Sequence, residues 1–405
     1  MERLKEPSKG GARLAHLDSL RGIAAVCVLA HHVGTETWLN WNRTYGGYTA
    51  HMNIGVTIFF LLSGFLLYRP FVASALSGKA QPPIGRYLRH RAFRILPAYW
   101  VALTALACWP GLTGVFTEDW WAYYALLQSY WGSFYGGIGP AWSLSVEASF
   151  YVALPLLSVL LAFLSRGLEP SRRLTLQNFS LGFLAIAGVG LNLWIRRNVW
   201  PDTIMAFWCW FALGMWLATQ KVAIGPSTPR PFWLRLTMHS PGLLWGAALV
   251  IYSFLALSPM FPRSFDGKTY TAEVRTLQHV LYAMVAFLVF LPAAFPSEKN
   301  TVPNRLLTHP LLVWVGSVSY GLFLWHAPLL RVIADYEGRR FPPLLGFPVL
   351  FIPTLAVGIL MGWLSYVLVE KPIMAGAAAI DRRIARNAAA SAVEAAARST
   401  GSSAN

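Results

Sequence analysis

The stretch IGVTIFFLLSGFLLYRPFVASAL, residues 54–76, decides the fold class. It is apolar over nearly its whole length, and its single charge, Arg69, lies near one end. About 20 apolar residues make a helix long enough to cross the hydrocarbon core of a bilayer. The stretch therefore predicts a membrane-spanning helix, and it gives a length standard for the rest of the chain.

The composition of the whole chain agrees with this reading. Of the 405 residues, 56% are apolar and only 12% are charged, whereas a soluble domain carries about 25% charged residues. The net charge of +16 does not indicate nucleic-acid binding, because the basic residues fall in short gaps between apolar runs. Cys27, Cys108 and Cys209 each stand alone in an apolar run, which predicts buried thiols without disulfides.

The same length standard predicts an all-α integral membrane protein, a polytopic bundle of about ten transmembrane helices. A further aromatic stretch at 119–133 is too short to span and indicates an interfacial or re-entrant segment. The ten helices are expected near residues 20–37, 54–76, 93–111, 141–164, 179–196, 202–220, 241–258, 277–295, 311–334 and 345–369.

The positions of Lys and Arg predict the orientation, because these residues concentrate in cytoplasmic loops. They gather before the first helix and then in every second loop, so both termini are expected in the cytoplasm and the protein in the inner (plasma) membrane. No small-residue cleavage site follows the basic N-terminus, so the first helix is expected to be retained. The expected domains are a basic segment at 1–16, a transmembrane domain at 17–373 and an Ala-rich tail, helical or disordered, at 374–405.

Two adjacent histidines end the first apolar run, AAVCVLAHHVG at 24–34. A helix rises 1.5 Å and turns 100° per residue, which puts His32 roughly 16 Å above Arg21 and within about 20° of it. Asp18 shares this stripe, whereas His31 points about 80° to the other side. His32 is therefore the better candidate for a functional base, and a histidine that only caps the helix end is the alternative reading.

A buried acid is expected in the fourth helix, AWSLSVEASFYVALPLL at 141–157. Glu147 lies about two turns in, with Ser143 and Tyr151 on the same face and Ser145 nearby. A carboxylate at that depth must be protonated, paired or exposed to a wet cavity. Its depth matches that of His32, so the two can meet, and Glu147 would then hold the tautomer of the imidazole. A polar contact between packed helices is the alternative.

A third histidine, His326, lies in GSVSYGLFLWHAPLL at 316–330 and is expected in the same outer layer. It is a candidate for substrate binding or an interfacial side chain. Adjacent histidines on one helix diverge, and the chain has no HxxxH or HExxH spacing, so the histidines and Glu147 predict no metal site.

Four arginines gather just before the third helix, in IGRYLRHRAFRILPAYW at 84–100: Arg86, Arg89, Arg91 and Arg94. The retention of basic residues in the cytoplasm explains their presence without a function. The preference for Arg over Lys suits fork-like binding of phosphates, which indicates a phosphorylated cytoplasmic donor.

Six strings in register resemble the membrane-bound acyltransferase-3 family of bacterial O-acyltransferases, over about residues 14–373. They are LDSLRGIAAVCVLAHH, GVTIFFLLSGFLLYRP, RHRAFRILPAYW, AWSLSVEASFYVALPLL, VSYGLFLWHAPLL and VEKP. The resemblance implies transfer of an acyl group, commonly acetyl, from acyl-CoA to a hydroxyl of a sugar or sugar-bearing molecule. It also implies a stand-alone transferase without an appended hydrolase-like domain.

The resemblance further implies roles for individual residues. The essential histidine of the family aligns with His32, its Arg-x-x-Arg pair with Arg91 and Arg94, and its helix-four glutamate with Glu147. Acyl-CoA is then a substrate, with no permanently bound cofactor. Direct attack by the acceptor and an acyl-histidine intermediate are both compatible with these residues.

A proton-coupled transporter or a non-catalytic membrane scaffold is the competing reading, since ionisable residues inside a bundle suit a carrier as well. Neither an inverted repeat nor a pair of broken helices is apparent to favour a carrier. The sequence leaves three classes of acceptor open: a surface polysaccharide, a glycolipid and a macrolide-type metabolite. It also leaves open the acyl chain length and the oligomeric state.

Overall fold

The computed structural model describes residues 9–131, 136–198, 203–225, 229–263, 270–297, 299–337, 341–384 and 387. Residues 1–8, in the predicted basic segment, and almost all of the predicted tail beyond residue 384 lie outside the described residues. All elements of the described part are helices, which confirms the all-α fold class.

The main helices are α1 (Lys9–Glu36), α3 (Ile54–Ser77), α4 (Ile84–Leu106), α6 (Trp142–Leu164), α7 (Pro170–Arg197), α8 (Ile204–Ala223), α10 (Pro241–Leu257), α11 (Ala272–Ala294), α13 (Pro310–Glu337) and α14 (Pro343–Ser365). Shorter turns of helix join them: η1 (Leu39–Trp41), α2 (Gly46–Ala50), η2 (His51–Asn53), η3 (Ala107–Gly111), α5 (Trp120–Tyr124), η4 (Gly139–Ala141), α9 (Phe232–His239), α12 (Val302–Leu307) and η6 (Tyr366–Glu370). The helix after η6 continues through residues 371–384.

Each of the ten predicted spans coincides with one of these long helices. Among the described residues, seven helices are long and apolar enough to cross a membrane, or eight if α9 and α10, bent by 96° at their junction, form one span. Of the ten helices that coincide with predicted spans, α1 and α8 do not meet this requirement for length and hydropathy. Helix α1 carries polar residues such as Asp18 and His32. The chain is thus a multi-pass membrane protein, whereas the count of ten and the placement of both termini stay predictions. In the aromatic stretch predicted at 119–133, the described residues 119–131 form the short helix α5 (Trp120–Tyr124) and turns.

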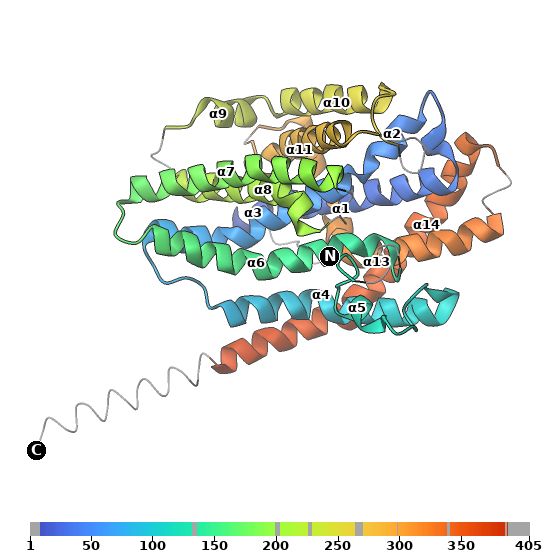
Figure 1. The fold of residues 1–405 in the computed structure, drawn as a ribbon, viewed down its shortest axis with the longest axis horizontal. Coiled ribbons are helices and arrows are strands. Elements are labelled where there is room, and N and C mark those ends of the chain that lie inside the picture. Colours follow the sequence, from blue (N-terminus) through green and yellow to red (C-terminus); the bar gives the residue numbers. More distant parts are fainter. Residues whose placement is uncertain are drawn as a thin grey trace, which may run out of the picture.

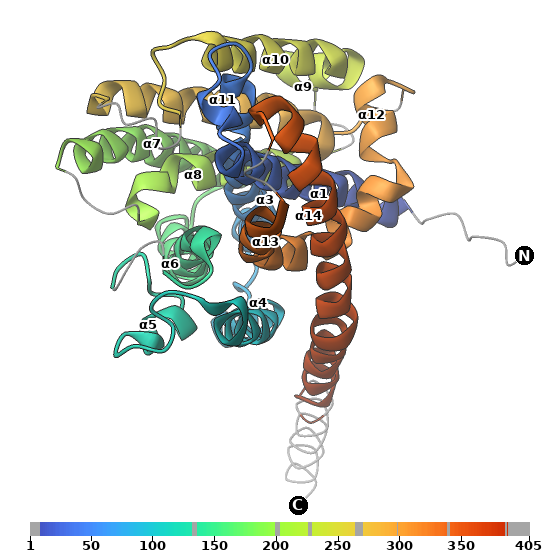
Figure 2. The same cartoon turned by 90° about the vertical axis from the view of Figure 1, so that its right-hand side faces the viewer.

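The long helices run side by side in one bundle (Figure 1). Viewed along the bundle, α1, α3, α13 and α14 occupy the middle, with α7, α8, α10 and α11 on one side and α4 and α6 on the other (Figure 2). The most extensive pairings are α3 with α8, α13 with α14, α1 with α13 and α7 with α8. Of the central helices, α3 packs against both flanking groups, whereas α1 contacts α11 on one side and α13 contacts α4 on the other.

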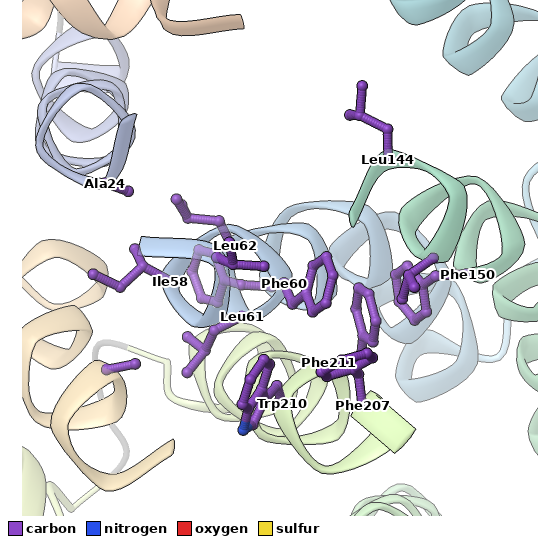
Figure 3. Packing of buried hydrophobic residues seen from close by; sticks show 14 of the residues in the cluster. Ala24, Ile58, Phe60, Leu61, Leu62, Leu144, Phe150, Phe207, Trp210 and Phe211 are labelled. Atoms are coloured by element: carbon purple, nitrogen blue, oxygen red, sulfur yellow. The ribbon is translucent and has the colours of Figure 1, made fainter. Parts of the chain in front are cut away.

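Aromatic stacking fixes α3, α6 and α8 to one another (Figure 3). The ring of Phe211 on α8 lies between Phe60 of α3, at a centroid distance of 4.7 Å, and Phe150 of α6, at 4.1 Å. All three side chains are fully buried. Because α6 also carries Glu147, this stack fixes the position of a candidate site residue.

Close backbone contact between α3 and α8 depends on two glycines. A Cβ atom on Gly64 would lie 2.3 Å from the carbonyl oxygen of Phe211, and one on Gly214 would lie 2.1 Å from that of Leu61. Small residues of this kind let membrane helices approach closely and gain van der Waals contact.

The variant Gly214→Val is therefore expected to force α3 and α8 apart and to destabilise the protein, on the order of 1–3 kcal/mol as for other overpacked cores. The measurement is the midpoint of thermal unfolding in detergent. The matched control is Gly246→Val in α10, where an added Cβ meets no atom within 4 Å. Equal midpoints for the two variants would contradict the assigned contact.

Candidate functional site

A cavity with about 820 Å³ of free space opens between α1, α3, α4, α6 and α13. Three cations line it, Arg21, Arg91 and Arg94, and we call it the arginine cavity. Its remaining polar lining consists of Ser63, Ser143, Glu147, Tyr151, Ser319 and Tyr320. The apolar part includes Phe59 and Phe323, whose rings lie 6.1 Å apart.

The helical phase of α4 divides its four arginines between two faces. Arg91 and Arg94 are three residues apart and line the cavity, whereas Arg86 and Arg89 lie on a second face and bind Asp381. Neither Arg91 nor Arg94 has a hydrogen bond or ion pair with a described residue, and Nε of Arg91 is buried without a partner. The arginine cavity therefore holds two cations whose charge is available for an anionic ligand.

Asp381 joins the C-terminal helix to the start of α4. Its carboxylate accepts hydrogen bonds from Arg86, Arg89 and His90, and its side chain is nearly buried. Figure 2 shows the C-terminal helix leaving the bundle beside α4. The sequence prediction that Arg86 and Arg89 bind the donor is not supported by this geometry, because an internal carboxylate already occupies them.

The variant Asp381→Asn is expected to release this helix, since an amide lacks the charge that holds three basic groups together. Trypsin should then cleave after Arg382 and Arg383 several times faster than in the wild type, because cleavage requires local opening. Glu273→Gln removes a carboxylate from the surface ion pair with Arg197 and serves as the control. An unchanged cleavage rate in Asp381→Asn would contradict the contact.

Glu147 lies in the wall of the arginine cavity on the second turn of α6. Its carboxylate accepts a hydrogen bond from the hydroxyl of Ser63 on α3. Arg21, on the opposite wall, donates to Asp18 across one turn of α1 at 2.9 Å. The cavity thus contains Glu147 and three arginines, and it is cationic overall.

A second cavity, the histidine cavity, lies further along α1 and α13 and has about 990 Å³ of free space. His32, Thr35 and Glu36 from the last turns of α1 form one wall. Ala327, Pro328 and Arg331 of α13 and the segment around η4, including Pro140, form the others.

A pair of histidines makes contact with the linings of both cavities. Nε2 of His326 lies 3.2 Å from Nδ1 of His32, and His326 is almost completely buried. The ring of Phe323, which lines the arginine cavity, lies 5.8 Å from the ring of His326. His32 itself lines the histidine cavity, so contacts from Phe323 through His326 to His32 connect the linings of the two cavities.

Backbone carbonyls assign the protons on both rings. Nδ1 of His326 lies 2.8 Å from the carbonyl oxygen of Phe323, and Nδ1 of His32 lies 2.8 Å from that of Val28. A carbonyl oxygen only accepts, so both Nδ1 atoms carry protons. The proton on Nδ1 of His32 then also points to the unprotonated Nε2 of His326. Nε2 of His32 is left with a free lone pair and makes no hydrogen bond to a described residue.

The expected pairing of Glu147 with His32 is wrong. Glu147 bonds to Ser63 in the arginine cavity, whereas His32 is oriented by His326 and by the carbonyl of Val28. Matching depth was not sufficient, because the two side chains line different cavities.

The structure distributes the other predicted residues unevenly. Ser143 and Tyr151 line the arginine cavity, as Arg21 does. Asp18 contributes only through its bond to Arg21. His31 and Ser145 are buried and line neither cavity. Among the described residues, no three His, Cys, Asp or Glu side chains form a group that could hold a metal ion.

Sequence reasoning missed two contributions. Ser63, the partner of Glu147, lies in an apolar run where a lone serine is an ordinary helix residue. Asp381 lies in the Ala-rich tail, for which the sequence predicts only a helical or disordered segment. The only sequence signal for Asp381 is its negative charge opposite a basic cluster.

Comparison with known proteins adds a family. Residues 14–363 match a family described as an acyltransferase domain. A peptidoglycan O-acetyltransferase of Listeria monocytogenes is 26% identical over 354 residues, which cover 78% of this chain and 49% of that protein. A putative peptidoglycan O-acetyltransferase of Bacillus subtilis is 25% identical over 394 residues, covering 91% and 56%. The chain thus spans about half the length of these relatives. No solved structure matches it.

Proposed function

This chain belongs to the acyltransferase family that its residues 14–363 match, and we propose that it is an O-acyltransferase of the plasma membrane. The proposed donor is acetyl-CoA, bound from the cytoplasm, and the acceptor is a hydroxyl of a carbohydrate. The names of the two relatives, both O-acetyltransferases, support the acetyl group and the attacking hydroxyl.

The arginine cavity supports the donor assignment. Arg91 and Arg94 would bind the phosphates of CoA, because they are cationic, line the cavity and have no internal partner. The pantetheine arm would extend past Phe59 and Phe323, which would place the thioester carbonyl near the histidine pair. Glu147 and Ser63, which are hydrogen-bonded to each other in the lining of the same cavity, would lie beside the bound donor.

His32 is the proposed general base. Its Nε2 would take the proton of the acceptor hydroxyl while the hydroxyl oxygen attacks the thioester carbonyl carbon. Collapse of the tetrahedral intermediate would break the C–S bond, and the imidazolium would return the proton to the departing thiolate. His326 is a positioning residue in this proposal. Its Nε2 accepts a hydrogen bond from the Nδ1–H group of His32, and this bond would stabilise the imidazolium.

One observation carries the proposal: a histidine pair, whose tautomers leave one basic nitrogen free, lines the histidine cavity through His32 and contacts Phe323 of the arginine cavity through His326. The test is transfer of label from [14C]acetyl-CoA to carbohydrate by the purified protein in nanodiscs. We expect label in glycan that mild alkali releases as acetate. The absence of transfer to every bacterial surface glycan offered would reject the proposal in favour of a non-catalytic or transport role.

Variants of His326 separate positioning from packing. His326→Leu should lower kcat about 10- to 100-fold, because the imidazolium loses one hydrogen bond to a charged donor. His326→Gln keeps an acceptor oxygen and should recover most of the loss. The measurement is the steady-state rate with saturating acetyl-CoA. Equal rates for the two variants would show that His326 acts only through packing.

A further inference from the structure

A third cavity, with about 600 Å³ of free space, lies between α3, α6, α7, α8 and α11. We call it the aromatic cavity, because Trp142, Phe207 and Trp210 line it. Trp142 also lines the histidine cavity. The aromatic cavity is therefore next to the space that contains His32, and one indole ring forms a wall of both.

The three aromatic rings of this wall contact one another in a row, and Phe207 and Trp210 expose only 3% and 5% of their surface. Ring centroids lie 5.6 Å apart between Trp142 and Phe207 and 5.0 Å between Phe207 and Trp210. Trp210 in turn stacks on His279 at 4.1 Å, and its indole nitrogen donates to the carbonyl of His279. Flat rings held in this way offer apolar contact to the C–H faces of a sugar ring.

The same cavity is also lined by three polar residues that can form hydrogen bonds: Asn53, Gln278 and Tyr282. The hydroxyl of Tyr282 donates to Oδ1 of Asn53 at 2.7 Å and lies 2.7 Å from Nδ1 of buried His51. Gln278 bonds to the same hydroxyl and to the carbonyl of Pro262. These contacts hold amide and phenol groups in place before any ligand arrives, which favours specific binding of hydroxyl groups.

Charge distinguishes this cavity from a neutral sugar site. Arg196 and Arg275 line it, and the described lining contains no carboxylate. The nearby acid Glu273 is paired with Arg197 instead. His279, also in the lining, has a buried Nε2 without a hydrogen-bond partner. The cavity thus combines two arginines with an aromatic wall.

We propose that the aromatic cavity is an acceptor subsite for a negatively charged sugar unit. A carboxylated sugar would contact the aromatic wall and pair with Arg275, while a neighbouring unit presents its hydroxyl to His32 past Trp142. This inference rests on the proposed function for its role, since it assigns the class of acceptor. The binding itself does not require catalysis.

Two tetrasaccharides that differ mainly in carboxylate groups test the charge preference. The probes are a hyaluronan tetrasaccharide, which alternates glucuronate and N-acetylglucosamine, and the same tetrasaccharide with its carboxyl groups reduced to neutral primary alcohols. Calorimetry with the full chain in nanodiscs should show about tenfold tighter binding of the carboxylated probe, as expected for one charge-assisted hydrogen bond. Binding of neither probe, or equal binding of both, would overturn the subsite.

Matched variants locate the preference. Arg275→Gln should remove the difference between the probes, whereas Arg197→Gln, the same charge change outside the cavity lining, should keep it. Phe207→Ala should weaken both probes alike, because stacking does not depend on the carboxylate. An unchanged preference in Arg275→Gln would overturn the assignment to this cavity.

Failure of the subsite and failure of the transferase proposal give different results. His32→Ala should bind the carboxylated probe like the wild type. If the wild type and the variants bind the carboxylated probe selectively but transfer no acetyl group, the subsite proposal is retained and the transferase proposal is rejected. Acetyl transfer without charge-selective binding would do the reverse.

Discussion

Replacement of His32 by alanine is expected to lower kcat for acetyl transfer about 100- to 10,000-fold, the contribution of a positioned general base. The side chain lines the histidine cavity with a free Nε2, and the described part of that wall offers no second imidazole. Binding of acetyl-CoA should persist, because the cations assigned to it lie in the other cavity. Initial rates and equilibrium binding of labelled acetyl-CoA measure the two quantities separately.

The neighbouring histidine supplies the control. His31→Ala removes the same side chain one residue away, from a buried position that lines neither cavity. We expect it to keep at least about a tenth of wild-type activity, once size-exclusion profiles show that both variants are folded. Equal losses in the two variants, or full activity in His32→Ala, would remove His32 from the role of base.

The length of apolar runs is enough to place the helices of this chain. Each predicted span falls on a helix because about 20 apolar residues have few other stable states in a bilayer. Helices such as α1 and α8 show the boundary of that argument. Arg21 and His32 in α1 and Gln220 and Lys221 in α8 lower the mean hydropathy of these helices, so hydropathy alone does not assign them as spans.

Helical phase predicts which residues share a face, and it does so correctly for part of the site. Arg21 and His32, placed on one stripe by their spacing, each line a cavity along the same side of α1. The partner of His32 could not be derived this way. His326 lies 294 residues further along the chain, and no periodicity specifies a contact between two distant helices.

The depth of a side chain in the membrane is likewise not enough to predict its contact partner, as Glu147 shows. The distance from a helix end gives the height of a side chain but not the direction in which it points across the bundle. Ser63 meets Glu147 because α3 packs beside α6 and the aromatic stack fixes their relative rotation. That rotation depends on tertiary packing of Phe60, Phe150 and Phe211, which no local pattern encodes.

Loss of the two cavity arginines is expected to produce the second large effect. Arg91→Gln combined with Arg94→Gln should raise KM for acetyl-CoA about 100-fold or more, because each charge-assisted hydrogen bond contributes about 1.5–3 kcal/mol. S-acetylpantetheine carries the same thioester without the phosphates. The wild type should therefore prefer acetyl-CoA strongly over S-acetylpantetheine in kcat/KM, and the double variant should lose most of that preference.

The same helix provides the matched control. Arg86→Gln combined with Arg89→Gln changes the charge of α4 by the same amount, but these arginines bind Asp381 outside the cavity. Its ratio of kcat/KM for the two donors should equal that of the wild type. A general attraction of CoA to a basic surface would instead reduce the ratio equally in both double variants, because long-range charge does not distinguish the two faces of one helix. A local phosphate site, in contrast, requires that the ratio falls only when the arginines on the cavity face of α4 are replaced. A difference in this ratio between the two double variants would therefore assign the phosphates to the arginine cavity.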